Sequence, residues 1–341
     1  MATDTQLRDD APGGKSGITV HAVRWVENLS ETQFAYLLLV PTVLILGVIA
    51  FWPLLSTFEM SLRADALIGA KPIGEYVGIK NYVDLLTGKR NAALTRPFMP
   101  GLSVDGQFPF LHVAGGTLFK SAITVTLIFT IVSVFFETII GFGQALVLDQ
   151  DFRGRRWVRV AIIIPWAVPV VIQGMIFFLL FQPGIGFLVE PLQQIGLFSS
   201  TPLINSVDSM IIVIVADIWK TSAFMALIIL AGLQSVDRSL YDVAKVAGAS
   251  KWQQFKLITF PIILPTILVA MLFRTIGAMR VFGIIETVSS CSTVPSLSCL
   301  VVTTFSQRRY GTAAAIAFLT ALLIAIVVSV YIWKFNDEGG V

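Results

Sequence analysis

Charged residues are scarce in this chain, and histidine and cysteine are scarcer still. Only 13% of its 341 residues are Asp, Glu, Lys or Arg, whereas 55% are hydrophobic, and the formal net charge is +3. This composition excludes an ordinary soluble domain and indicates a polytopic membrane protein. The net charge is too small to suggest nucleic-acid binding. The only histidines, His21 and His112, leave little for a metal site or general-base chemistry, so we expect no metal and no enzymatic activity in this chain.

A complete nucleotide phosphate loop is also missing. Gly14-Lys15-Ser16 matches the end of that motif, but its first glycine would stand at position 9, which is Asp9. We therefore expect any ATP hydrolysis to come from another chain. We also expect no secretory signal, because the first 33 residues are polar and the apolar run that follows is longer than the apolar part of a signal peptide.

Long apolar runs are what the sequence has in abundance. A membrane-spanning helix needs about 20 consecutive, mostly apolar residues. Six stretches meet this requirement, which predicts an all-α protein with six transmembrane helices and both termini on the same side. These stretches are approximately Phe34–Leu55, Ala122–Leu148, Val158–Phe181, Met210–Leu233, Ile262–Val288 and Ala313–Trp333.

Basic residues predict which loops face the cytoplasm. Loops rich in Lys and Arg stay on the cytoplasmic side of a membrane. The loop at 149–157 holds three arginines and the loop at 235–257 holds Arg238 with three lysines, whereas the loop at 182–208 has no basic residue. We therefore predict a cytoplasmic N-terminal segment (1–33), a transmembrane domain (34–335) and a cytoplasmic tail (336–341). The segment at 63–120 would form a small external cap, and 235–257 a cytoplasmic loop.

A short amphipathic helix is predicted inside that cytoplasmic loop. Ser239 and Asp242 have the spacing of a capping box that would begin it. Apolar residues at i, i+3, i+4 and i+7 give it one apolar stripe, and Gly248 would end it. A helix that neither spans the membrane nor belongs to a soluble domain needs a cytoplasmic protein to pack against. The stripe consists of Leu240, Val243, Ala244 and Ala247.

The sequence of the same loop resembles a motif of a known protein family. The run from Asp242 to Gly248, nine further residues and then Ile258-Thr-Phe-Pro261 resembles the cytoplasmic-loop motif of ATP-binding-cassette (ABC) importer permeases. The motif has Glu at 242, Ala at 243, Asp at 247 and Leu at 260, where this chain has Asp, Val, Ala and Phe. Flanking segments resemble the sugar-importing branch, which includes maltose and trehalose permeases; they are 217–224, 231–234 and 273–282.

This resemblance implies a type I permease fold in which the loop helix is a coupling helix. It implies as partners two ATPase subunits that bind ATP and Mg, a second homologous permease and an extracytoplasmic solute-binding protein. No cofactor is expected in this chain. The substrate would be a di- or oligosaccharide such as trehalose or maltose, with glycerol phosphate or another small solute as alternatives. The residues that would contact the ATPase are Leu240, Asp242, Val243, Ala244, Ala247, Gly248 and Ala249.

Two predicted spans carry charged residues at bilayer depth, where each costs at least about 2.5 kcal/mol on insertion scales. Asp217 and Lys220 can pair directly, because three residues apart they share a helix face. Either such charges fix helix packing, or they line the substrate path. The resemblance favours the path, at positions Asp217, Lys220, Thr221, Phe224, Arg274, Gly277, Ala278 and Val281.

Glu137 lies in the second span without a nearby cation in the sequence, so we expect it to pack against a basic residue of another span. Cys291 and Cys299, the only cysteines, lie in a predicted outer loop, where a disulfide is permitted.

Two other classes of function remain open. In an ion-gradient transporter, Asp217, Lys220 and Arg274 would form a proton or ion relay. The sequence shows neither the inverted repeat nor the matching broken helices of that class, and prolines in the spans are interpreted as shaping single helices. A non-transporting membrane enzyme or scaffold has little to support it, because the two histidines lie far apart in opposite predicted compartments.

Overall fold

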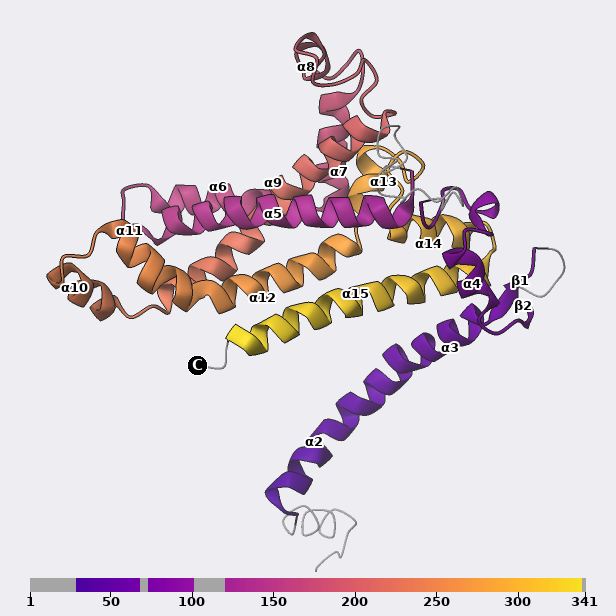
Figure 1. The fold of residues 1–341 in the computed structure, drawn as a ribbon, viewed down its shortest axis with the longest axis horizontal. Coiled ribbons are helices and arrows are strands. Elements are labelled where there is room, and N and C mark those ends of the chain that lie inside the picture. Colours follow the sequence, from indigo (N-terminus) through magenta and orange to yellow (C-terminus); the bar gives the residue numbers. More distant parts are fainter. Residues whose placement is uncertain (1–28, 68–72, 101–119, 339–341) are drawn as a thin grey trace, which may run out of the picture. The chain divides into compact units, whose positions relative to one another are not determined.

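The computed structural model describes residues 29–67, 73–100 and 120–338. Most of the predicted N-terminal segment, parts of the predicted external loop, the end of the tail and both histidines lie outside these ranges. The elements, shown in Figure 1, are in chain order α2 (Glu31–Leu46), η1 (Gly47–Phe51), α3 (Trp52–Ser61), β1 (Arg63–Asp65), β2 (Ile73–Tyr76), α4 (Lys80–Leu86), η2 (Asn91–Ala93), α5 (Ala122–Asp149), α6 (Arg155–Ala167), α7 (Val170–Phe181), α8 (Val189–Gln194), α9 (Ser206–Gln234), α10 (Arg238–Val246), α11 (Lys251–Gln254), η4 (Phe255–Thr259), α12 (Phe260–Met279), α13 (Gly283–Val288), α14 (Leu297–Ser306) and α15 (Tyr310–Glu338).

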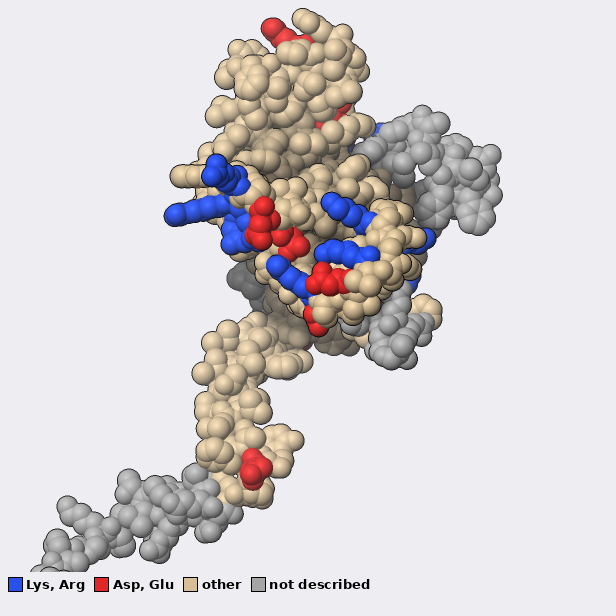
Figure 2. Space-filling model, turned by 90° about the vertical axis from the view of Figure 1, so that its left-hand side faces the viewer, with Lys and Arg blue, Asp and Glu red and all other residues tan. Residues whose placement is uncertain are grey.

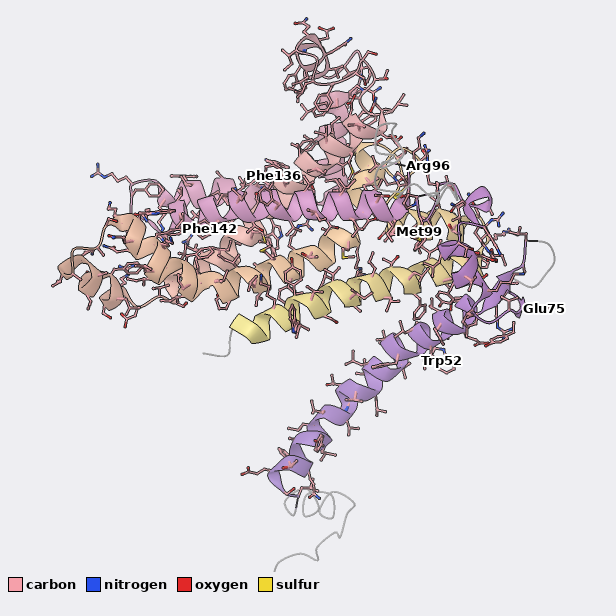
Figure 3. The ribbon with its side chains drawn as sticks, in the orientation of Figure 1. Trp52, Glu75, Arg96, Met99, Phe136 and Phe142 are labelled. Atoms are coloured by element: carbon pink, nitrogen blue, oxygen red, sulfur yellow. A yellow bond between two sulfur atoms is a disulfide. The ribbon has the colours of Figure 1, made fainter. Side chains whose placement is uncertain are left out.

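The chain forms two compact units, Met1–Thr57 and Phe58–Val341. In the first unit, a capping box begins α2: the Ser30 hydroxyl accepts the Gln33 N–H, and the Gln33 side chain accepts the Ser30 N–H. The helix continues through the π-helical turn η1 into α3, where Trp52 lies (Figure 3). The run Glu31–Ser61 contains the first predicted span and is long and apolar enough to cross a membrane.

The second unit is built around the long helices α5, α9, α12 and α15. Helices α5 and α9 pack closely along much of their length, and a glycine makes this approach possible. A Cβ atom added at Gly141 would lie 2.5 Å from the Met225 Cβ and 2.9 Å from the Ser222 carbonyl oxygen. Small residues serve this purpose between helices in membranes, where the backbones must come close.

Among the described residues, five helices are long and apolar enough to cross a membrane, or six if the bent pair α6 and α7 forms one span. The prediction of a helical polytopic membrane protein is thus confirmed. The predicted third span, however, is not continuous, because α6 and α7 meet at 93°. Pro169 explains the break: it disfavours helical geometry at the preceding residue, and Val168 is extended with ψ 130°.

The fifth span is shorter than predicted. It ends as α12 at Met279, and the chain restarts as the short helix α13 after Phe282, whose backbone (φ −146°, ψ −64°) is not helical. Helix α13 then packs against α7, where a Cβ added at Gly174 would overlap the Thr287 side chain. The third predicted span is therefore a bent pair of helices, whereas the fifth is continuous over Lys251–Met279 and ends nine residues before its predicted end at Val288.

Part of the predicted 63–120 loop forms a compact cap on the start of α15. Strands β1 and β2 pair antiparallel, and α4 packs on α15. Arg90 joins the pieces, since its guanidinium lies 2.8 Å from Asp65 Oδ2 and 2.7 Å from Asn81 Oδ1. The Thr312 N–H of α15 donates to Asp65 Oδ1 at 2.9 Å. We call this end of the second unit the cap end.

The cysteines lie at the cap end. Cys291 and Cys299 are joined by a disulfide, with their Cα atoms 5.3 Å apart. Arg96, labelled in Figure 3, ties the cap to this loop because its Nε donates to the Ser292 carbonyl at 2.8 Å. Helices α10 and α11 mark the opposite end of the unit in Figure 1, which we call the loop end.

Candidate functional site

Helix α10 at the loop end begins earlier than the sequence predicts. Its N-cap is Asp237, whose Oδ1 accepts the Ser239 N–H at 2.9 Å. The predicted capping box of Ser239 and Asp242 is therefore wrong; Asp242 instead pairs with Lys245 at 3.0 Å. The Ser239 N–H stabilises the charged carboxylate and lowers the pKa of Asp237. An acidic N-cap satisfies free backbone donors, so it fixes where this exposed helix starts.

The end of α10 is the glycine stop that the sequence predicts. Gly248 has φ +78°, its N–H donates to the Lys245 carbonyl at 3.0 Å, and the Ala249 N–H donates to the Ala244 carbonyl at 2.9 Å. This pair of bonds is a Schellman motif, in which the left-handed position favours glycine. Helix α10 is thus limited at both ends by local contacts.

The apolar side chains of α10 face away from the unit. Leu240 is 42% exposed, Val243 69% and Val246 92%. Of the rest of the predicted stripe, Ala247 is exposed and Ala244 half-buried. The prediction omitted Val246, the most exposed of these residues. Exposed apolar side chains on one short helix are typical of a protein-contact surface.

Helix α10 is tied to the transmembrane helices from its other side. The Tyr241 hydroxyl lies 2.8 Å from the Thr259 Oγ1 at the end of η4, and Tyr241 packs against the buried cluster formed by α5, α9 and α12. Phe255 of η4 packs edge-on against Phe142 of α5, with ring centroids 5.8 Å apart; Phe142 is labelled in Figure 3. A displacement of α10 would therefore pull on α5 and on the start of α12.

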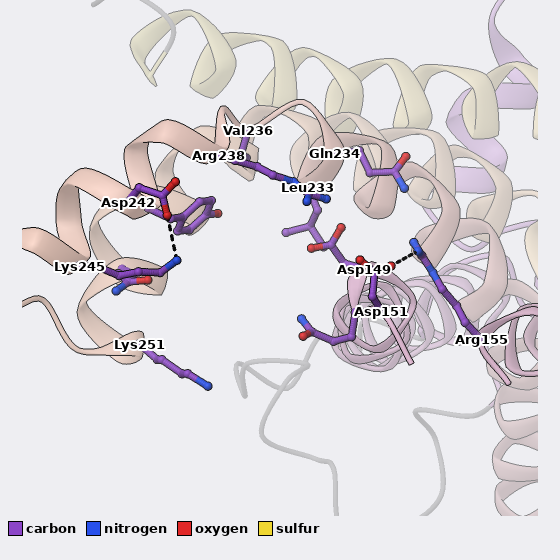
Figure 4. Close-up of a pocket in the computed structure, with 13 residues that line it drawn as sticks. Asp149, Asp151, Arg155, Leu233, Gln234, Val236, Arg238, Asp242, Lys245 and Lys251 are labelled. Carbon is purple, nitrogen blue, oxygen red and sulfur yellow. Dashed lines mark hydrogen bonds and ion pairs between the residues drawn. The ribbon is translucent and has the colours of Figure 1, made fainter. Parts of the chain in front are cut away.

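A charged pocket opens beside α10. It has a volume of about 1,000 Å³ and lies between the turn at 149–155 and the loop of α10 and α11 (Figure 4). Figure 2 shows Lys, Arg, Asp and Glu side chains gathered on this end of the unit. Arg155 pairs with Asp151 at 2.9 Å. The charged lining residues are Asp149, Asp151, Arg155, Arg238, Asp242, Lys245 and Lys251.

A buried ion cluster joins three long helices between these two ends. Arg274 of α12 pairs with both Glu137 of α5 and Asp217 of α9, and its Nη2 lies 2.9 Å from Glu137 Oε1. The Thr221 hydroxyl donates to the same Glu137 oxygen at 2.6 Å. Glu137 is fully buried, and Asp217 and Arg274 are each 8% exposed. The expectation that Glu137 meets a basic residue of another span is confirmed.

Lys220 has a different role from the one its spacing suggests. It forms no ion pair with Asp217; its Nζ donates to the carbonyls of Trp166, at 3.1 Å, and Val168. These carbonyls lie at the end of α6, where the break at Pro169 leaves them without helical partners. A cation at this position also interacts favourably with the C-terminal end of the helix dipole. The predicted pairing of Asp217 with Lys220 is therefore wrong.

Replacing Lys220 with methionine should lower the thermal stability of the detergent-solubilised protein. The change removes a cation from a partly buried helix end, which is worth up to about 2 kcal/mol. Lys220→Arg keeps the charge and the donors, so it should retain most of the stability. Unchanged melting of Lys220→Met, together with an altered choice of substrate, would instead place this side chain in the substrate path.

The other predicted path residues do not gather at one site. Phe224 packs in the cluster near the loop end, while Ala278 and Val281 are buried in the cluster nearer the cap. Val281 cannot share a helix face with Arg274, because α12 ends before it. Gly277 is exposed, and a Cβ there would lie 3.2 Å from the Arg274 Nη1. Its role as a substrate contact stays a prediction.

The charged positions are apparent from the sequence, but the pairing of Asp217 with Arg274 is not. Glu137 is the central acceptor of the cluster, yet it was not among the predicted site residues. An isolated acid in an apolar span was its signal. Asp237 and the turn at 149–155 were also missed; the sequence Asp237-Arg-Ser239 is itself compatible with an N-cap two residues before its donor.

Comparisons with known proteins agree with this architecture. Residues 137–334 match the family model described as "Binding-protein-dependent transport system inner membrane component". The chain is 31% identical to the trehalose/maltose transport system permease protein MalF of Thermococcus litoralis, over 89% of this chain and 93% of that protein. It is 28% identical to the trehalose transport system permease protein SugA of Mycobacterium tuberculosis H37Rv, over 90% of each.

A solved structure shares the fold. A chain of the bacterial ABC transporter involved in the import of the acidic polysaccharide alginate superposes with a TM-score of 0.68 at 20% identity, covering 92% of this chain and 99% of that one. The matching family model covers more than half of the sequence, from the second predicted span to the last. The chain therefore belongs to the inner-membrane components of binding-protein-dependent transport systems, the permeases of ABC importers.

Proposed function

We propose that this chain is the carbohydrate permease of an ATP-driven importer, with a di- or oligosaccharide such as trehalose or maltose as its substrate. It would assemble with two ATPase subunits, which supply ATP and Mg chemistry, a second homologous permease and an extracytoplasmic solute-binding protein. The loop end and both termini would face the cytoplasm. The names of the two relatives support a sugar as the substrate.

One observation carries the proposal: a short helix displays apolar side chains at the end of a membrane bundle while its opposite side is anchored to that bundle. Val243 and Val246 of α10 are exposed, and Tyr241 is bonded to Thr259. Such a helix can transmit force from a partner into α12. The Asp242 and Lys245 side chains, which pair exposed on its surface, add polar groups that a partner can bind.

The coupling mechanism follows from this anchoring. Closure of the ATPase pair would move α10, and the contacts of Tyr241 and Phe255 would pass that movement to α12 and α5. The cluster of Glu137, Asp217 and Arg274 joins α5, α9 and α12, so these helices would move together. Nucleotide can shift the permease between inward- and outward-facing states only if it binds them with different affinity.

The first test is uptake by proteoliposomes that hold this chain with its partner subunits and the binding protein. Labelled trehalose or maltose should enter only when ATP is present on the ATPase side, and a protonophore should leave uptake unchanged. Uptake that stops with the protonophore at constant ATP would contradict the proposal and favour a gradient-driven transporter.

The contact with the ATPase can be tested separately. Val243→Asp places a charge on the apolar side of α10, so it should reduce co-purification of the ATPase about 30-fold, as expected for loss of a contact worth about 2 kcal/mol. Ile79→Asp is the matched control, because Ile79 is equally exposed, at 69%, but lies in the cap. Equal recovery of the ATPase with both variants would exclude α10 as the docking helix.

A further inference from the structure

An exposed arginine stands at the cap end of α12. Arg280 directly follows the last residue of α12 and is exposed, and none of the ion pairs found among the described residues includes it. Phe273 and Gly277 of α12 are exposed as well, and the Arg280 N–H donates to the Gly277 carbonyl at 3.1 Å, which holds Arg280 next to the last turn of the helix. The candidate membrane span ends at Met279, so Arg280 lies at its end, where an arginine can reach water, a water-filled cavity or a partner.

Arg280 lies in a groove between α12, α14 and α15. The groove has a volume of about 550 Å³, within the range of about 300–1,000 Å³ that is usual for small-molecule sites. Most of its walls are apolar, and Arg280 is the only charged residue in its lining. The lining residues are Ile276, Arg280, Phe282, Ser298, Val301, Val302, Ala317, Thr320, Ala321 and Ile324.

The few polar groups of the groove have the chemistry that a sugar needs. The Arg280 guanidinium offers several donors in a planar fork, which can bind two neighbouring hydroxyls at once. The Thr320 Oγ1 donates to the Ile316 carbonyl at 2.8 Å, which leaves the lone pairs of that oxygen as acceptors. Ser298 adds a second hydroxyl. The apolar walls, with Phe282 among them, suit the C–H faces of a sugar ring.

Arg274, by contrast, is poorly placed to bind a ligand. Two carboxylates already occupy its guanidinium. A sugar that replaced these partners would leave buried carboxylates without a counter-charge, at a cost of several kcal/mol. The cluster is thus better suited to hold helices together, and polar recognition of a ligand falls to the accessible arginine.

We propose that this groove is a sugar-binding subsite on the translocation path, in which Arg280 determines specificity by hydrogen-bonding ring hydroxyls and Thr320 accepts a further one. The proposal rests on the function proposed above and adds the residues that hold the sugar. The translocation path would then run past Gly277 and Arg280 at the cap end of α12. The ion cluster of Glu137, Asp217 and Arg274 would hold the helices in position and would not bind the sugar.

The test compares Arg280→Gln, Thr320→Val and Arg308→Asn in the complete complex, reconstituted with ATP, binding protein and labelled maltose or trehalose. Arg308 is an exposed arginine after α14 with φ +62°, a conformation that asparagine tolerates. Arg280→Gln should lower the sugar transported per ATP hydrolysed about tenfold or more, as loss of a charge-assisted hydrogen bond predicts. Thr320→Val should lower it less, Arg308→Asn should leave it unchanged, and ATP hydrolysis stimulated by the binding protein should persist in all three.

Each outcome separates this inference from the proposed function. If the wild-type complex transports sugar and both Arg280→Gln and Thr320→Val keep its transport ratio, the groove is not the subsite. If Arg280→Gln fails to assemble while Thr320→Val transports normally, Arg280 pairs with the second permease and the inference is also wrong. If the wild-type complex takes up no sugar with ATP, it is the proposed function that fails.

Discussion

Replacing Arg274 with alanine should prevent stable folding of the permease. The substitution leaves Glu137 and Asp217 buried beside each other without a cation. Breaking a buried ion pair by removing one partner typically costs about 3–5 kcal/mol, a large part of the stability of most proteins. The expected result is a loss of the monodisperse peak when the detergent extract is analysed by fluorescence-detected size-exclusion chromatography.

The cause can be isolated by removing the charges together. A triple variant with Arg274→Met, Glu137→Gln and Asp217→Asn has no buried charge at this point, so it should recover much of the folded protein. Arg63→Ala is the control, because Arg63 forms an exposed pair with Glu59 at 2.6 Å and such pairs contribute about 0–1 kcal/mol. If Arg274→Ala remained folded at wild-type yield, these charges could not be what fixes α5, α9 and α12.

The recovery of the triple variant also distinguishes packing from transport. Neutral side chains can fill the same space, but they cannot transfer a proton along a chain of ionisable groups. A folded triple variant that still transports sugar with ATP would therefore exclude the alternative in which Asp217 and Arg274 relay an ion. Failure of transport with normal folding and ATP hydrolysis would instead return these residues to the substrate path.

The spans and the loop helix could be predicted because their causes are local. A run of about 20 apolar residues is sufficient to predict a membrane helix, and the bounds of α5 agree with the prediction to one residue. Gly248 is predictable as a helix end because the helix stop requires only that one residue adopt a left-handed backbone conformation, which glycine does readily. The start of α10 was missed for an equally local reason: two candidate caps, Asp237 and Ser239, lie two residues apart.

The helix breaks and the ion cluster depend on distant contacts. A proline inside a span is compatible with a mild kink or a full break of the helix. At Pro169 the full break is stabilised by Lys220, whose amino group donates to the carbonyls that the break leaves without helical partners. The three-residue spacing of Asp217 and Lys220 on one helix is compatible with an ion pair between them. In the structure Asp217 pairs instead with Arg274, 57 residues away. The spacing of residues within one helix cannot predict which residue of another helix a buried charge will pair with.

Gly248→Val should disconnect ATP hydrolysis from uptake without affecting membrane insertion. Gly248 has φ +78°, and an added Cβ would have no heavy atom within 4 Å. The effect must therefore come from the backbone, where a β-branched residue at this angle costs about 1–3 kcal/mol. The end of α10 would unwind and α10 would no longer transmit movement. We expect uptake of labelled sugar to fall at least tenfold while the complex still hydrolyses ATP.

Two controls test whether backbone strain at this position is the cause. Gly248→Asn adds a side chain of similar size but tolerates the left-handed region, so it should keep most of the uptake. Gly196→Val imposes the same strain at φ +74°, also with open space around the added Cβ, but in the loop between α8 and α9, so transport should continue. If Gly248→Asn lost uptake as fully as Gly248→Val, the partner would require a bare glycine surface at this point. The Schellman motif would then matter less for coupling than the direct approach of the ATPase to the Gly248 backbone.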